Sequence, residues 1–281
     1  MTKSSLARGV QDVADQLPSQ DEIVRLLHED KPITEAHFDE IFPRGRPGAC
    51  VLVLKDEHGR IVVTEEVEAR DAEHVEPFLQ KVKNLGLPLK TFYIDTCQAY
   101  RKAIAKVFPE ARIQLDYFHV IQNVWRHVWK YFVSRRRAIE ERSKEVSTPW
   151  YKAHLEALAA TLWKRRHLVF KAEDRLSPQE REELTEIVQT DPQVGRIRTF
   201  LRGVWHIFED SHDEAQARQA LQDLKKLTVP EGTQAFQKSV DFLEENFEAM
   251  TTFLRVEGVK RNSLAESGMR TLRRLEQEHD G

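Results

Sequence analysis

The sequence KTFYIDTCQAYRKAIAKVFPEARIQLDYFHVIQN, residues 90–123, decides the predicted fold. It opens with an apolar strand that ends at Asp95 and continues with an amphipathic helix over residues 98–108. A second strand over residues 111–115 ends at another acid, Asp116. Two successive strands joined by a helix are typical of an α/β sheet, and such sheets bind ligands at the carboxyl ends of their strands. We therefore expect the functional site at the strand ends that carry these two aspartates.

Composition restricts the class of protein. The 281 residues are 32% charged and 40% hydrophobic, with a mean hydropathy of -0.56, as in a soluble globular protein. There is no apolar run of about 18 residues and no apolar signal-peptide core near the N-terminus, so we expect a cytoplasmic protein with no membrane partner. Cys50 and Cys97 are isolated, which predicts neither a zinc site nor a disulfide.

Charge is unevenly distributed along the chain. The net charge is -3, but residues 101–170 hold 15 Lys and Arg against 6 Asp and Glu, a surplus of nine that leaves -12 for the remainder. A basic segment in an acidic chain indicates contact with a polyanion. Charge alone favours the plainer interpretation, a solvated helix face whose charges are met by acids elsewhere in the fold.

The residues upstream of this stretch complete a sheet. Residues 1–32 are expected to form an N-terminal helical arm, since Leu6 to His28 reads as two short helices divided at Pro18. Short apolar runs then predict strands over residues 36–42, 50–54 and 60–67, the last two forming a hairpin, and an amphipathic helix follows over residues 70–87.

The resulting order, β-β-β-α-β-α-β with acids on the first and fourth strands, is the arrangement of an RNase H-like domain with a mixed sheet. In that fold the central strands are neighbours, so Asp39 and Asp95 are expected to face each other although 56 positions separate them. Two close carboxylates repel as anions and favour a hard cation, Mg²⁺ or Mn²⁺. A pair of such ions serves in-line attack on a phosphodiester. The layout therefore predicts metal-dependent phosphoryl transfer on nucleic acid.

A long helix is predicted over residues 119–145. Trp125 and Trp129 lie one turn apart on it, among cations that are candidate DNA contacts: Arg126, Lys130, Arg135, Arg136 and Arg137. Aromatic rings interleaved with cations can stack on unpaired bases and hold phosphates. Aromatics at this spacing more often pack inside a helical bundle. We therefore favour packing for the tryptophans and DNA contact for the arginines.

Further amphipathic helices follow, and the last informative stretch is residues 255–278. The predicted domains are the arm at 1–32, the first part of the catalytic core at 33–145, an all-helical insertion at 146–253, and a C-terminal catalytic helix at 254–281. In that last helix Ser263 and Glu266 fit a capping box. Glu266 equally fits a third metal-binding carboxylate beside basic residues that would lie near the phosphates: Lys260, Arg261, Arg270, Arg273 and Arg274. Local sequence leaves both interpretations open.

Four segments together carry a family resemblance: HFDEIFPRGR, EARDAEHVEPFL, YIDTCQAYRKAIAKVFPEARIQLDYFHVIQN and RNSLAESGMRTLRR. They resemble the DDE transposases of bacterial insertion sequences over about residues 36–280. More narrowly, Asp116-Tyr-Phe-His119 resembles the D-x-x-H signature of Mutator-like and related families.

The resemblance implies an RNase H-like fold and a transposase that cleaves and joins DNA at the ends of a mobile element. It implies Asp39, Asp95 and Glu266 as catalytic and metal-binding acids with two divalent ions, and Asp116 and His119 as supporting residues. The implied partner is double-stranded DNA, at the element ends and the target, bound by a homodimer or larger oligomer associated with the nucleoid.

Asp56 competes with Asp39 for the first acid because it follows a better apolar strand, but its setting, Asp-Glu-His-Gly, is ordinary turn chemistry. Relatives usually carry an upstream DNA-binding domain and continue beyond the catalytic helix. Two alternatives therefore stay open at this stage. One is a truncated, inactive remnant that binds DNA or a partner, and the other is an RNase H-like nuclease specific for DNA structure.

Overall fold

The computed structural model describes residues 19, 22, 24, 32–43, 48–171, 173–227 and 234–259. Within them the chain forms two compact units, divided between Asp116 and Tyr117. The first holds a sheet with two helices, and the second is helical. This division lies inside the segment 33–145, which the sequence analysis assigns to a single part of the catalytic core. The predicted domain boundaries remain predictions.

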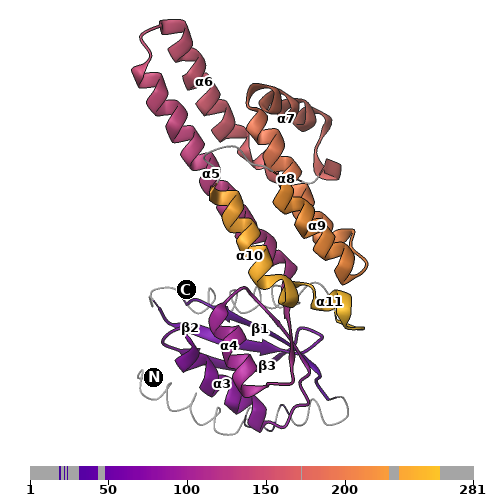
Figure 1. Cartoon of the computed structure of the whole chain (residues 1–281). Helices are drawn as coiled ribbons and strands as arrows, with labels where there is room; N and C mark the ends of the chain where they lie inside the picture. Colours follow the sequence, from indigo (N-terminus) through magenta and orange to yellow (C-terminus); the bar gives the residue numbers. More distant parts are fainter. Residues whose placement is uncertain are drawn as a thin grey trace, which may run out of the picture. The chain divides into compact units, whose positions relative to one another are not determined.

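The first unit is built on a five-stranded mixed sheet with strand order β3-β2-β1-β4-β5 (Figure 1). Strand β1 pairs antiparallel with β2 and parallel with β4, while β3 is antiparallel to β2 and β5 is parallel to β4. The strands have the following bounds: β1 Glu35–Ile41, β2 Cys50–Lys55, β3 Ile61–Val67, β4 Thr91–Ile94 and β5 Arg112–Leu115. The predicted element order β-β-β-α-β-α-β is confirmed.

Two helices cover one face of this sheet, α3 (Ala72–Asn84) and α4 (Gln98–Val107). Phe38 of β1 stacks on Phe78 of α3, with ring centroids 5.4 Å apart, and on Tyr100 of α4 at 4.4 Å. Because side chains alternate along a strand, residues two positions from Phe38 face the same helices. The apolar side of each helix is fully buried here, as its 3.6-residue spacing predicts.

The second unit begins with α5, a helix of 29 residues from Tyr117 to Glu145. Its predicted apolar stripe, from Val120 through Val124 and Val128 to Phe132, is buried. Helix α6 runs back beside α5, α9 packs on α8, and α10 lies along α5 (Figure 1). The remaining bounds are α6 Pro149–Arg165, η1 Arg166–Phe170, η2 Glu173–Arg175, α7 Pro178–Thr190, α8 Pro192–Glu209, α9 Glu214–Lys226, α10 Gln234–Met250 and α11 Thr252–Arg255.

Helix starts in this unit follow capping chemistry that the sequence contains. Ser177 and Glu180 form a capping box at the start of α7, and Asp213 accepts from the Gln216 N–H at the start of α9. In the predicted N-terminal arm only Ser19, Glu22, Val24 and Pro32 are described, and Ser19 and Glu22 form a capping box. The rest of the arm lies outside the described residues. No helix in the described ranges is both long enough and apolar enough to cross a membrane.

Candidate active site

Three aspartates occupy neighbouring positions across the parallel strands β1, β4 and β5. The register pairs Phe38 with Ile94 and Ile94 with Leu115. The residue after each of these three is an aspartate: Asp39 lies within β1, and Asp95 and Asp116 directly follow β4 and β5. Neighbouring strands lie about 4.8 Å apart, so the sheet brings together three acids that are distant in sequence. The row lies at the sheet edge where the sequence predicts the site.

Asp39 sits on β1, where its side chain is partly exposed and accepts a hydrogen bond from the Glu40 N–H at 2.9 Å. Lys55 of β2 is fully buried and lies within electrostatic reach of Asp39. Burial lowers the pKa of Lys55, and the Asp39 carboxylate opposes that shift. The first predicted acid therefore has a buried cation as a neighbour.

Asp95 belongs to a charged network centred on Arg70. One carboxylate oxygen of Asp95 accepts from the Cys97 N–H at 2.7 Å, and the other accepts from Nη1 of Arg70 at 3.2 Å. The same Nη1 donates to Glu40, whose second oxygen accepts from the Tyr100 hydroxyl. The strand register thus places the backbone of Asp39 beside that of Asp95. The side chain of Asp95, by contrast, is linked to that of Glu40 through their shared contact with Arg70.

Glu40 is the most deeply buried acid of this network, with 8% of its surface exposed. Burial raises its pKa, repulsion from Asp95 adds to the shift, and the Tyr100 hydroxyl and the Arg70 guanidinium oppose it. The pKa of Arg70 is raised in spite of burial because Glu40 and Asp95 stabilise its charge. Arg70 lowers the pKa of Glu40 and Glu40 raises the pKa of Arg70, so each group offsets part of the cost of burying the other's charge.

These carboxylates supply the type of donor that a divalent cation prefers, which is oxygen. Asp39 and Asp95 are both only partly buried, so an ion could reach them. Within the described residues, no three His, Cys, Asp or Glu side chains come together as a metal-binding cluster. Glu266, the third predicted ligand, lies outside the described residues. Two of the three predicted ligands, Asp39 and Asp95, thus lie in the described part of the chain.

Asp56 has a different role, at the turn between β2 and β3. Its fully buried carboxylate accepts from the N–H groups of His58 at 2.9 Å and Arg60 at 2.8 Å, and from Arg60 Nε at 2.6 Å. Because β2 is antiparallel to β1 and His37 pairs with Lys55, this turn lies toward the start of β1, away from Asp39. The geometry agrees with the interpretation of Asp56 as a turn residue.

Asp116 and His119, the two residues of the proposed signature, occupy neighbouring elements. Asp116 is buried at the end of β5, and its N–H donates to the Ile94 carbonyl at 2.8 Å, which extends the β4–β5 pairing by one residue. His119 lies in the first turn of α5, with its ring edge-on to Phe118. Asp116 thus ends the sheet and His119 opens the helical unit.

The arginine triplet on α5 is divided in its contacts. Arg135 donates to Asp191, which is 3% exposed, at 3.1 Å, and Arg136 pairs with Glu140 at 2.6 Å. Arg137 is exposed. Two of the three arginines in the triplet are therefore engaged within the helical unit. Of the other predicted DNA contacts, Arg126 and Lys130 are exposed on α5, and five lie outside the described residues: Lys260, Arg261, Arg270, Arg273 and Arg274.

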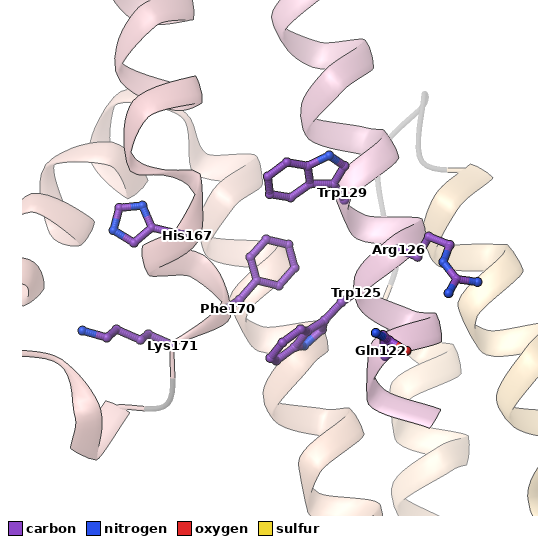
Figure 2. Close-up of a pocket in the computed structure, with 7 residues that line it drawn as sticks. All are labelled: Gln122, Trp125, Arg126, Trp129, His167, Phe170 and Lys171. Atoms are coloured by element: carbon purple, nitrogen blue, oxygen red, sulfur yellow. The ribbon is translucent and has the colours of Figure 1, made fainter. Parts of the chain in front are cut away.

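Trp125 and Trp129 do not lie wholly within the bundle core, contrary to the favoured sequence interpretation. Trp125 is partly buried and Trp129 is 38% exposed. Both line a pocket of about 580 Å³ within the helical unit (Figure 2). The reason is geometric: Val124 and Val128 fill the core stripe, and the tryptophans, one position further on, are turned to its edge.

Sequence reasoning missed the role of Glu40, Arg70 and Lys55. A signal for Glu40 was available, because it lies two positions after Phe38 and must face the same buried layer. A buried carboxylate requires a cation or hydrogen-bond donors. Nothing local identifies Arg70 as that cation, since 30 positions separate the two residues.

The mixed five-stranded sheet with helices on one face and a separate helical unit defines a mixed α/β protein, in which three aspartates occupy neighbouring positions across the parallel strands. A family model described as Transposase, for DDE transposases of the ISL3 type, matches residues 38–277. The chain belongs to this family of insertion-sequence transposases, enzymes that act on DNA. The match does not support the narrower Mutator-like grouping or its D-x-x-H signature. No curated protein matches the chain.

Proposed function

We propose that this chain is a DNA transposase that cleaves and joins phosphodiesters at the ends of a mobile element, with Asp39, Asp95 and Glu266 as its catalytic acids. The observation that carries the proposal is that Asp39 of β1 and Asp95, just past β4, directly follow the paired residues Phe38 and Ile94 of two adjacent parallel strands. The family match, which spans all three acids, supports it. The strand order supports an RNase H-like core.

Asp39, Asp95 and Glu266 would hold two divalent ions, Mg²⁺ or Mn²⁺. When bound, such ions activate the attacking water or 3′-hydroxyl and stabilise the leaving oxygen. The protein's own part is to orient the carboxylates. The Cys97 N–H and Arg70 fix the two oxygens of Asp95, and the Glu40 N–H fixes one oxygen of Asp39. Asp116, beside Asp95 in the row, would support the site, as would His119.

The DNA would be held by cations outside the sheet. Arg126, Lys130 and Arg137 are exposed on α5, which suits them to phosphate contact. Arg135 and Arg136 would contribute through the helices they brace, and the basic residues beyond residue 259 would act near the reacting phosphates. We expect the protein to act as a homodimer or larger oligomer on DNA in the cytoplasm, because two element ends must be joined to one target.

Strand cleavage and joining test this proposal. Purified full-length protein is incubated with labelled DNA carrying the element ends and with Mg²⁺ or Mn²⁺. The Asp95→Asn variant should lose product, and Asp39→Asn should behave alike. Asp71→Asn is the matched control, because Asp71 caps α3 through the His74 N–H and asparagine caps equally well. Unchanged activity in Asp95→Asn would exclude the proposed site.

A further inference from the structure

The pocket in the helical unit is framed by aromatic rings. Figure 2 shows Phe170 of η1 pointing between Trp125 and Trp129 of α5. Its ring centroid lies 5.6 Å from that of Trp125 and 6.3 Å from that of Trp129. The volume, about 580 Å³, is within the range of small-molecule sites, roughly 300–1,000 Å³. Flat aromatic walls of this kind suit a flat ligand.

The walls are held in place before any ligand arrives. The guanidinium of Arg166 lies over the ring of Trp129 at 4.5 Å from its centroid, and over that of Trp163 at 3.8 Å. Such cation–π contacts restrict the rotation of the indole while leaving Trp129 38% exposed. A preorganised ring loses little entropy when a ligand stacks on it.

One wall carries an unsatisfied hydrogen-bond donor. The indole Nε1 of Trp125 is buried and has no hydrogen-bond partner among the described residues. Buried polar groups are nearly always paired, and an unpaired one costs about 1–3 kcal/mol. A ligand that shifts the rings around this indole and brings a ring nitrogen or carbonyl oxygen to it would satisfy the N–H.

Two cations line the pocket, Arg126 and Lys171, and the described lining contains no acid. Lys171 is paired with Glu180 at 2.7 Å. Arg126 is exposed, and among the residues the structure describes no carboxylate forms an ion pair with it. An anionic ligand is therefore favoured over a purely apolar one.

The neighbouring residue His127 lies near further cations. Its pKa is lowered by burial first, and then by Lys130, Lys238 and Arg126. The groups around it come from both packed helices: Lys238 and Ser239 lie on α10, and the Ser239 hydroxyl is 3.2 Å from His127 Nδ1. Both α5 and α10 thus contribute cations near Arg126.

We propose that this pocket binds an unpaired nucleobase of a DNA strand, stacked on the exposed ring of Trp129, with the adjacent phosphate on Arg126. The inference rests on the proposed action on DNA and adds a subsite that lies in the helical unit rather than on the sheet. Aromatic faces supply stacking for any base, the Trp125 N–H supplies one hydrogen bond, and the cations supply phosphate contact.

Binding of labelled DNA to the full-length protein, in the absence of divalent ions, tests the pocket. Three probes are compared: a perfect duplex, the same duplex with one central unpaired adenine, and the single strand. Trp129→Leu should weaken binding of the last two probes about five- to a hundredfold, the range that base stacking contributes, and leave the perfect duplex unchanged. Trp150→Leu is the control, because Trp150 is 73% exposed and does not line the pocket.

A second variant keeps the test independent of folding. Arg126→Gln replaces an exposed residue, so it should fold normally, weaken all three probes and reduce the salt slope of binding by about one. Equal affinity of Trp129→Leu and the unaltered protein for the unpaired adenine would overturn the proposal. A change of oligomeric mass in Trp129→Leu with unaltered DNA binding would also overturn it, and would assign the pocket to a second copy of the chain.

The two proposals fail separately. Loss of unpaired-base binding in Trp129→Leu supports the pocket even if no strand cleavage is found. Conversely, cleavage that depends on Asp95, together with unaltered base binding in Trp129→Leu, keeps the transposase and rejects the pocket.

Discussion

Replacing Arg70 with methionine removes the cation that Glu40 and Asp95 share. Breaking a buried ion pair by deleting one partner costs about 3–5 kcal/mol. The Arg70 side chain is 37% exposed, so solvent screens part of the interaction, and we reduce the expected loss to about 2 kcal/mol. The loss arises at Glu40, which is buried and would keep only the Tyr100 hydroxyl as a described partner.

The pH dependence gives this prediction its sign. The folded-state pKa of Glu40 is already raised, and Arg70→Met removes a group that lowers it. The folded variant then binds a proton more readily than the unfolded chain, so its stability falls as pH rises from the unfolded pKa, 4.5, through the folded one. The loss in free energy of unfolding caused by Arg70→Met should therefore be larger at pH 8 than at pH 5.

Urea denaturation at these two pH values measures the effect. The double variant Glu40→Gln with Arg70→Met should recover most of the loss at pH 8, because the buried charge has gone, and a double-mutant cycle gives the coupling between the two residues. An Arg70→Met protein as stable as the unaltered one would refute this reasoning. So would a loss of stability from Arg70→Met that is the same at pH 5 and pH 8, and the same with Glu40 or Gln at position 40.

The remaining predictions concern the sheet and α5. Asp56→Ala should cost about 2–3 kcal/mol in urea denaturation, because three donors lose a buried acceptor. Burial alone would raise the pKa of Asp56, but these donors lower it, so its contribution is complete above pH 3.8 and is lost as pH falls through the folded pKa. An equal deficit at pH 7 and in strong acid would contradict this. Lys55→Met should leave stability at pH 7 unchanged or raise it by about 1 kcal/mol, since it removes a buried charge. Because the folded-state pKa of Lys55 is lowered, the unaltered protein gains stability as pH rises toward 10.5, so any stability advantage of Lys55→Met should shrink there. A marked loss of stability in Lys55→Met at pH 7 would show that the contact with Asp39 outweighs the cost of burial. Arg135→Met should lower the stability of the helical unit by about 1 kcal/mol, whereas Arg137→Met should weaken DNA binding and reduce its salt slope by about one without a change in stability. Thermal unfolding and salt titration of DNA binding measure these effects. A loss of stability in Arg137→Met together with weaker DNA binding in Arg135→Met would contradict the prediction.

Much of the fold follows from local patterns in the sequence. The strand alternation, the apolar faces of α3 and α4, and the stripe from Val120 to Phe132 all predict the elements that the structure has. The alignment of Asp39 with Asp95 follows once the order of strands is assumed, since Asp39 lies within the first predicted strand and Asp95 ends the fourth. These features are local or depend on a single topological choice, which is why they can be predicted.

The partners of the acids could not be predicted in the same way. Arg70 lies 30 positions from Glu40 and 25 from Asp95, and its contacts depend on how α3 is placed against β1 and β4. The tryptophans illustrate the same limit on α5. A rotation of one residue, about 100° around the helix, separates the core position of Val124 from the pocket position of Trp125, and the packing of η1 determines what each one meets.

The central claim is that Asp39 and Asp95 hold a divalent ion together, and metal-directed cleavage of the protein tests it most directly. Fe²⁺ that replaces Mg²⁺ at the site generates hydroxyl radicals with ascorbate and peroxide, and these cut the polypeptide beside its ligands. We predict fragments ending near residues 39 and 95 that disappear with excess Mg²⁺ and in Asp95→Asn. Cuts confined to other positions, or cuts near residue 39 that persist in Asp95→Asn, would contradict the claim.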